Sequence, residues 1–92
     1  MYNFDFDYVM KNGQRVNLTG TADVFYKSWK ENGKTLSDEN VAVESIKYQV
    51  YLPDNKMGEE VDFTKEFECS PERERIENKI VEEFLREDAL KN

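Results

Sequence analysis

Aromatic and polar residues alternate strictly at the start of the chain, where the aromatic positions are Tyr2, Phe4, Phe6 and Tyr8. This two-residue period is typical of a β-strand with one buried face and one solvated face. The segment Lys11-Asn12-Gly13-Gln14 follows, and an Asn-Gly pair readily adopts the positive φ angles of a type I′ turn. The pattern therefore predicts a strand that folds straight back on itself as the first half of a hairpin.

Two further segments have the character of long strands. Residues 15–26 alternate apolar and polar positions, and Gly20 in the middle predicts a bulge or bend. Residues 41–52 are rich in β-branched and aromatic side chains. Between them, residues 27–40 are mostly polar, so we expect a long loop from which Trp29 folds back onto the core.

Alternation returns after a turn, in residues 61–67, which we expect to form a short edge strand. Its apolar positions, expected to point inward, are Val61, Phe63 and Phe67. Ser70 followed by Pro71 then predicts the start of a helix, because serine caps free N–H groups and proline is tolerated in the first turn.

Apolar residues of the predicted helix form two stripes at its four-residue spacing. Ile76, Ile80 and Phe84 form the first stripe, and Val81 and Leu85 form the second. One stripe can cover the sheet while the other contacts a second subunit. We therefore expect the stripe of Ile76, Ile80 and Phe84 to be available as a dimer or partner surface.

The elements combine into an α+β fold, a four-stranded mainly antiparallel sheet with a long C-terminal α-helix. The 92 residues form a single acidic domain over positions 1–92. A domain of this size buries a small core, so a homodimer is expected to supply additional buried surface.

The negative charge is concentrated in the last third of the chain. Residues 1–58 carry eight acids against seven bases, whereas residues 59–92 carry twelve against six, for a net charge of −7. A field of that sign repels nucleic acid and membrane surfaces and attracts basic partners. Direct binding to nucleic acid or membrane is therefore not expected.

The sequence lacks the residues that most enzyme chemistry requires. The absence of histidine excludes histidine relays and histidine metal sites, and one cysteine cannot form a disulfide or a cysteine-built zinc site. Cys69 is expected to be a partly buried apolar residue. No phosphate-binding glycine loop or dinucleotide motif occurs, so neither a metal nor another cofactor is expected. With no signal peptide or membrane-spanning segment apparent, a cytosolic protein is expected.

Carboxylates follow the polar positions of the predicted strands and flank the apolar arc of the helix. Rows of carboxylates at strand and helix spacing are separated by roughly 6 Å, broadly comparable with phosphates along a nucleic-acid strand. The candidate acids are Asp5, Asp7, Asp62, Glu66, Glu68, Glu74, Glu77, Glu87 and Asp88. The outward face of the helix interleaves acids with bases, which is the pattern of an ordinary solvated surface.

Several segments resemble a known family. This short acidic chain is similar to the Arn-type anti-restriction nuclease proteins of T-even-type phages. The segments that carry the resemblance are MYNFDFDYVMKNGQRVNLTG, VESIKYQVYL, VDFTKEF and ERERIENKIVEEFLRED. The resemblance implies an early phage protein in the cytoplasm of the infected bacterium. It implies a DNA mimic that evades host defence by blocking the restriction endonuclease McrBC, which cuts DNA containing modified cytosine.

Three hypotheses follow. In the first, the protein is an inhibitor whose acids occupy the DNA-binding site of a restriction endonuclease or another basic DNA-binding protein. In the second, it is a small acidic interaction module that binds a partner through the helix stripe or through a strand edge. The third, a hydrolase using paired carboxylates, needs a substrate cleft that one sheet and one helix rarely enclose. We expect the protein not to be an enzyme.

Overall fold

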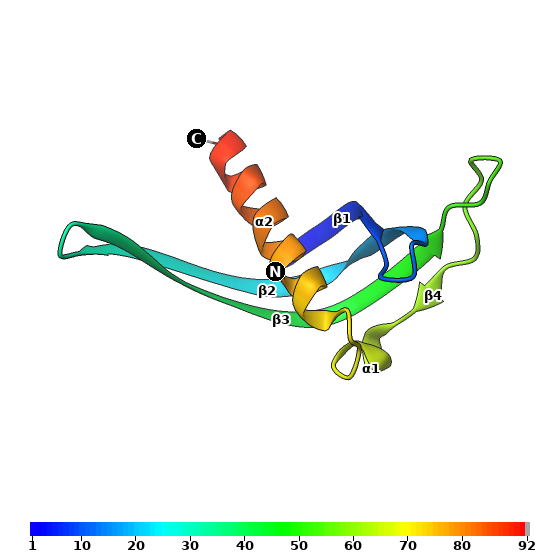
Figure 1. Cartoon of the computed structure of the whole chain (residues 1–92), viewed down its shortest axis with the longest axis horizontal. Helices are drawn as coiled ribbons and strands as arrows, with labels where there is room; N and C mark the ends of the chain where they lie inside the picture. Colours follow the sequence, from blue (N-terminus) through cyan, green and yellow to red (C-terminus); the bar gives the residue numbers. More distant parts are fainter. Residues whose placement is uncertain (92) are drawn as a thin grey trace.

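The computed structural model describes residues 1–91 as one sheet with a C-terminal helix. The elements are β1 (Tyr2–Val9), β2 (Arg15–Glu31), β3 (Lys34–Val50), β4 (Val61–Asp62), α1 (Thr64–Phe67) and α2 (Arg73–Lys91). The strands lie in the order β1-β2-β3-β4, and each neighbouring pair is antiparallel (Figure 1). The predicted α+β class and the four-stranded antiparallel sheet with a C-terminal helix are confirmed.

The core lies between α2 and one face of the sheet, here called the inner face. Even-numbered residues of β1 and β2 point to this face, and the alternation read from the sequence is confirmed in both strands. The buried core residues include Phe4, Phe6, Tyr8, Val16, Leu18, Ala22, Ile46, Ile76 and Ile80. Odd-numbered residues of β1 and β2 point to the opposite face, here called the outer face.

The helix begins as the sequence predicts, because the Ser70 Oγ accepts a hydrogen bond of 3.1 Å from the Glu72 N–H. The expected partner stripe is wrong, however. Ile76 and Ile80 are fully buried against the inner face, and the half-buried Phe84 packs edge-on to Tyr2 with ring centroids 5.4 Å apart. The domain uses this stripe for its own core, since these are the side chains with which α2 contacts the sheet.

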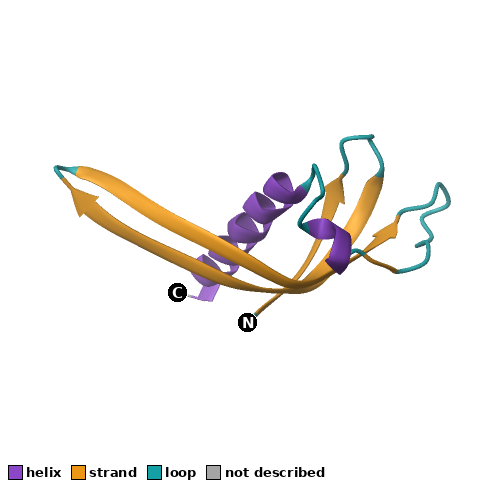
Figure 2. Cartoon of the chain, turned by 90° about the horizontal axis from the view of Figure 1, so that it is seen from below, coloured by secondary structure: helices purple, strands orange, loops and turns teal. Residues whose placement is uncertain are grey.

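The expected loop over residues 27–40 is also wrong. β2 and β3 remain paired throughout this region, from Phe25 opposite Asn40 to Glu31 opposite Lys34, and form a two-stranded ribbon that projects from the sheet (Figures 1 and 2). Asn32 and Gly33 close the ribbon with φ angles of 53° and 78°, the backbone signature of a type I′ turn. We call this ribbon, residues 25–40, the arm.

Two of the other predicted local structures also differ. The first hairpin closes through Gly13, whose N–H donates to the Met10 carbonyl at 2.8 Å, and Gly13 rather than Asn12 has a positive φ. The expected strand over residues 61–67 stops at Asp62. Asp62 accepts the Thr64 N–H at 2.9 Å and the chain turns into α1, which buries Phe67.

Gly20 makes room for the core. A side chain at this position would overlap the Ser45 carbonyl oxygen and approach the Phe4 ring to 2.7 Å. The predicted bulge lies next to it, since Thr21 is opposite Ser45 while Ala22 is opposite Val43. The extra residue in β3 locally increases the twist at the root of the arm.

We expect Gly20→Ala to lower the free energy of unfolding by about 1–3 kcal/mol, the typical cost of overpacking a core. Gly58→Ala is the matched control, because its added methyl would lie 3.4 Å from the nearest atom, the Val50 carbonyl oxygen. Urea unfolding of both variants measures the difference. Equal midpoints for the two variants would contradict the close approach described at Gly20.

Candidate acidic interface

The outer face of the sheet carries carboxylates at both of its edges. Asp5 on β1 is opposite Thr19, Thr19 is opposite Lys47, and Lys47 is opposite Asp62 on β4. Three steps between neighbouring strands at about 4.8 Å each place these two aspartates roughly 14 Å apart along the sheet. The pairing therefore brings acids that are distant in sequence onto one face, with a lysine between them.

The β1 edge holds a fixed pair of carboxylates. Asp5 and Asp7 both accept hydrogen bonds from the Asn17 amide, at 2.8 and 3.3 Å, and Asp7 also accepts one from the Tyr51 hydroxyl at 2.6 Å. The Tyr51 hydrogen bond is the main cause that lowers the pKa of Asp7 below its usual value. Arg15 approaches Asp7 at 3.7 Å. These contacts keep Asp7 ionised and well oriented at the surface.

The β4 edge holds a second group of acids. Asp62 and Glu66 line one open hollow of about 520 Å³ together with Ser45, Thr64 and Lys65. Hydrogen bonds from Thr64 are the main cause that lowers the pKa of Asp62 below its usual value. Asp62 is thus ionised at neutral pH, and Glu66 reaches the same hollow from α1 rather than from the expected strand.

The remaining candidate acids lie elsewhere. Glu68 and Glu77 line a separate hollow of about 180 Å³ near the root of the arm, and Arg73 pairs with Glu77 at 3.5 Å. Glu74, Glu87 and Asp88 are exposed on α2, and α2 covers the inner face. Burial and the nearby Glu87 raise the pKa of the Tyr2 hydroxyl to about 12. The nine candidates are therefore divided between two sides of the sheet.

Cations accompany some of these acids without cancelling the negative charge. Lys47, in the middle of the outer face, pairs with Glu60 at 3.2 Å, and both side chains are about half exposed. Exposed ion pairs contribute little to stability and leave both charges accessible to solvent. Among the residues that the structure describes, Glu66, Glu68 and Glu74 have no ion pair within 4 Å.

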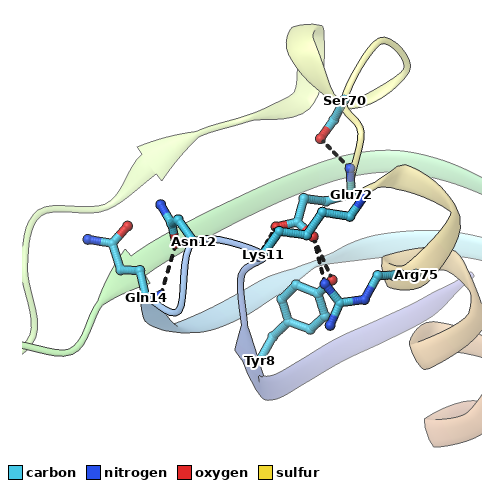
Figure 3. Close-up of polar contacts among 7 residues, drawn as sticks. All are labelled: Tyr8, Lys11, Asn12, Gln14, Ser70, Glu72 and Arg75. Atoms are coloured by element: carbon cyan, nitrogen blue, oxygen red, sulfur yellow. Dashed lines mark hydrogen bonds and ion pairs between the residues drawn. The ribbon is translucent and has the colours of Figure 1, made fainter.

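Glu72 is buried, although the interleaved acids and bases of the helix predict a solvated outward face. Figure 3 shows its carboxylate between the first hairpin and the start of α2. It accepts hydrogen bonds from the Tyr8 hydroxyl at 3.1 Å and from the Lys11 N–H at 2.7 Å, and it pairs with Arg75 at 3.1 Å. Burial and the Glu72 hydrogen bond raise the pKa of Tyr8 to about 12.

The position of Glu72 has a signal in the sequence. It lies four residues before Ile76, so it extends the buried stripe of α2 by one turn. A carboxylate there can remain buried because the Tyr8 hydroxyl, a backbone N–H and a guanidinium satisfy it. Glu72 is therefore a structural link between β1 and α2, outside the acidic interface.

Other kinds of site find no support in the described part of the chain. It contains no group of three or more histidine, cysteine, aspartate or glutamate side chains placed to hold a metal ion. None of its helices combines the length and the apolar character needed to cross a membrane. Cys69, expected to be partly buried, is exposed.

We expect Glu72→Ala to lower the free energy of unfolding by about 1–3 kcal/mol, because the buried Tyr8 hydroxyl loses its acceptor. Glu82→Ala is the control, since Glu82 forms exposed ion pairs on the same helix and its loss should cost less than about 1 kcal/mol. A double-mutant cycle with Tyr8→Phe, followed by urea unfolding, isolates the coupling. Additive effects of Glu72→Ala and Tyr8→Phe would contradict the proposed link.

Comparison of this chain with protein-family models, with curated proteins and with solved structures found no match. The likeness to the Arn-type family rests on the sequence segments quoted above. What the geometry itself provides is a sheet whose outer face carries ionised, hydrogen-bonded carboxylates at both edges.

Proposed function

We propose that this protein is an inhibitor of the DNA-mimic type, whose outer sheet face occupies the DNA-binding site of a restriction endonuclease such as McrBC. The observation that carries the proposal is the placement of Asp5 and Asp7 at one edge of that face and of Asp62 and Glu66 at the other, with Asp5, Asp7 and Asp62 held by hydrogen bonds. Such a face presents two parallel acidic edges to a basic groove.

The spacing of these groups supports the proposal. Asp5 and Asp7 are two residues apart on a strand, about 6.6 Å, which is comparable with the separation of neighbouring phosphates once the winding of a DNA strand is included. The two acidic edges lie roughly 14 Å apart along the sheet, while the major groove of B-DNA is about 12 Å wide. Lysines and arginines arranged to contact two phosphate strands can therefore reach both edges.

The fixed geometry also supports the proposal. A mimic gains affinity only if its charges are already oriented, because ordering flexible side chains on binding costs free energy. Hydrogen bonds from Asn17 and Tyr51 hold the β1 pair, and those from Thr64 hold Asp62. Protein carboxylates have no phosphodiester bond, so an endonuclease that binds them has nothing to cleave.

The overall shape is compatible with this role. The molecule measures 52 × 29 × 24 Å, and 52 Å corresponds to about 15 base-pair steps of 3.4 Å. The arm supplies part of this length and carries no net charge, with three lysines and three acids in residues 25–40. The acidic contact is thus assigned to the body of the molecule, residues 1–24 and 41–92, which holds the entire net charge of −7.

The test is competition between this protein and DNA for purified McrBC, read as inhibition of DNA cleavage. The variant Asp5→Asn/Asp7→Asn/Asp62→Asn/Glu66→Gln removes four charges from the outer face. We expect its half-inhibitory concentration to rise at least about tenfold, equivalent to about 1.4 kcal/mol.

The control variant Glu74→Gln/Glu77→Gln/Glu82→Gln/Glu87→Gln removes the same number of charges from α2 and should inhibit like the wild-type protein. Circular dichroism establishes that both variants are folded. Equal inhibition by the outer-face variant and the wild-type protein would exclude the outer face as the contact. Equal losses in both variants would indicate that net charge alone matters, which would also overturn the assignment.

A further inference from the structure

The edge of β3 is left open where β4 ends. β4 pairs with β3 at Lys47 and Tyr48, and the last backbone bond along this line joins the Phe63 N–H to the Ile46 carbonyl at 2.9 Å. The chain then leaves the sheet and turns into α1 (Figure 1). In the described part of the chain, no segment continues the sheet beyond this bond. The place of a strand beside residues 41–45 is therefore vacant.

The backbone of this open segment has hydrogen-bonding groups that face away from β2. Successive residues of a strand direct their N–H and C=O groups alternately to the two sides. Ile46 directs its groups toward β4, and the bulge beside Gly20 adds one residue, so the next residues with this orientation are Val43 and Val41. Ala42 between them faces β2. Val41 and Val43 thus offer donors and acceptors to an added strand.

A hollow of about 180 Å³ lies beside the same segment. Its lining includes the apolar side chains of Val41, Val43 and Phe67, and the polar side chains of Glu68 and Arg73. Residues directly opposite each other on neighbouring strands place their side chains on the same face of a sheet. An added strand would therefore direct every second side chain into this hollow, where apolar groups are favoured.

Acids outnumber bases around the vacant place. The charged residues there are Glu44, Glu66, Glu68 and Glu77 against Lys65 and Arg73. Arg73 is already engaged, by the Glu77 carboxylate at 3.5 Å and by the Glu68 carbonyl at 3.4 Å. Glu44 and Glu68 are exposed and form no ion pair within 4 Å among the described residues. These carboxylates attract a basic segment and repel a second copy of a chain whose net charge is −7.

We propose that the open edge of β3 at residues 41–45 binds an extended basic segment of another protein, which adds a strand to the sheet in the place that β4 leaves vacant. Backbone hydrogen bonds to Val41 and Val43 supply affinity, and alternating side chains supply specificity. Apolar side chains of the segment enter the hollow, while its lysines or arginines approach Glu44 and Glu68.

This binding site is separate from the acids on which the proposed inhibition most depends. Asp5 and Asp7 lie on β1, at the opposite edge of the sheet. The inference does not rest on the proposed function. The variant Asp5→Asn/Asp7→Asn should therefore bind a basic segment like the wild-type protein, so inhibition and strand addition can fail separately.

The probe is a peptide of eight residues with blocked ends, in which lysine and valine alternate, titrated into the full chain by calorimetry. In the proposed arrangement the valine N–H groups face β3 and the lysine N–H groups face solvent. N-methylation of the two central valines should weaken binding at least tenfold, because it removes hydrogen bonds and keeps every charge. N-methylation of the two central lysines is the matched control and should change binding little.

Amide hydrogen exchange, read residue by residue by NMR, locates the contact. In the free protein the N–H groups of Val41 and Val43 face away from β2 and should exchange fast, whereas that of Ala42 faces β2 and should exchange slowly. The bound peptide should slow exchange at Val41 and Val43 at least tenfold and change Ala42 little. Association through charge alone would not produce this alternation.

The charge variant is Glu44→Gln/Glu68→Gln, which should weaken binding of the lysine–valine peptide at least fivefold. Glu82→Gln/Glu87→Gln is its control, since it removes two charges from exposed positions of α2 and should bind the peptide like the wild-type protein. A peptide with glutamate in place of each lysine should not bind to any of these proteins.

Four results would overturn the proposal. The first is no binding of the lysine–valine peptide at millimolar concentration. The second is equal binding of the peptides methylated at valine and at lysine, which would indicate attraction by charge alone. The third is protection from exchange outside residues 41–45. The fourth is a fall in the mass of the protein when the peptide binds, because the edge would then be held by a second copy of the chain.

Discussion

The antiparallel pairing of β2 with β3 is the constraint on which the rest of the molecule depends. The pairing extends from Val16 opposite Val50 to Glu31 opposite Lys34, and it contains one bulge beside Gly20. At one end of this ribbon β1, β4 and the helices add a third and fourth strand and a core. At the other end nothing is added, so the same ribbon becomes the arm.

This asymmetry separates two kinds of surface. The body has neighbouring strands that orient carboxylates of the outer face, as the Asn17 amide on β2 does for Asp5 and Asp7 on β1. The arm has no buried side chains and presents apolar groups with balanced charge. The net negative charge and the exposed apolar side chains of the arm therefore lie on different parts of a 92-residue chain.

The elements with an unambiguous period were predictable from the sequence. The strict alternation of β1 and the Ser70 cap identified the first strand and the start of the helix. Phe63 and Phe67 were wrongly predicted to lie in a strand, because a separation of four residues fits the period of a strand and also that of a helix. The Asp62 hydrogen bond to the Thr64 N–H decided in favour of the helix.

The arm and the buried carboxylate were missed for different reasons. Residues 27–40 are polar because both faces of the arm are solvated, so their composition resembles that of a loop. The Asn32-Gly33 pair between two alternating segments was the available signal for a hairpin. Glu72 was missed because its charge suggested solvent, although its place one turn before Ile76 put it on the buried stripe. The positions of the outer-face acids depended on strand pairing, which the period alone could not supply.

If carboxylates of the outer face stand in for phosphates, as we propose, the salt dependence of binding to McrBC measures this most directly. A basic site that takes up a phosphate-like surface releases counterions, so the logarithm of the affinity should fall linearly with the logarithm of the salt concentration. We expect a steep slope for the wild-type protein and a shallower one when Asp5, Asp7, Asp62 and Glu66 are replaced by their amides. An affinity that does not change with salt, or a slope that the four replacements leave unaltered, would contradict it.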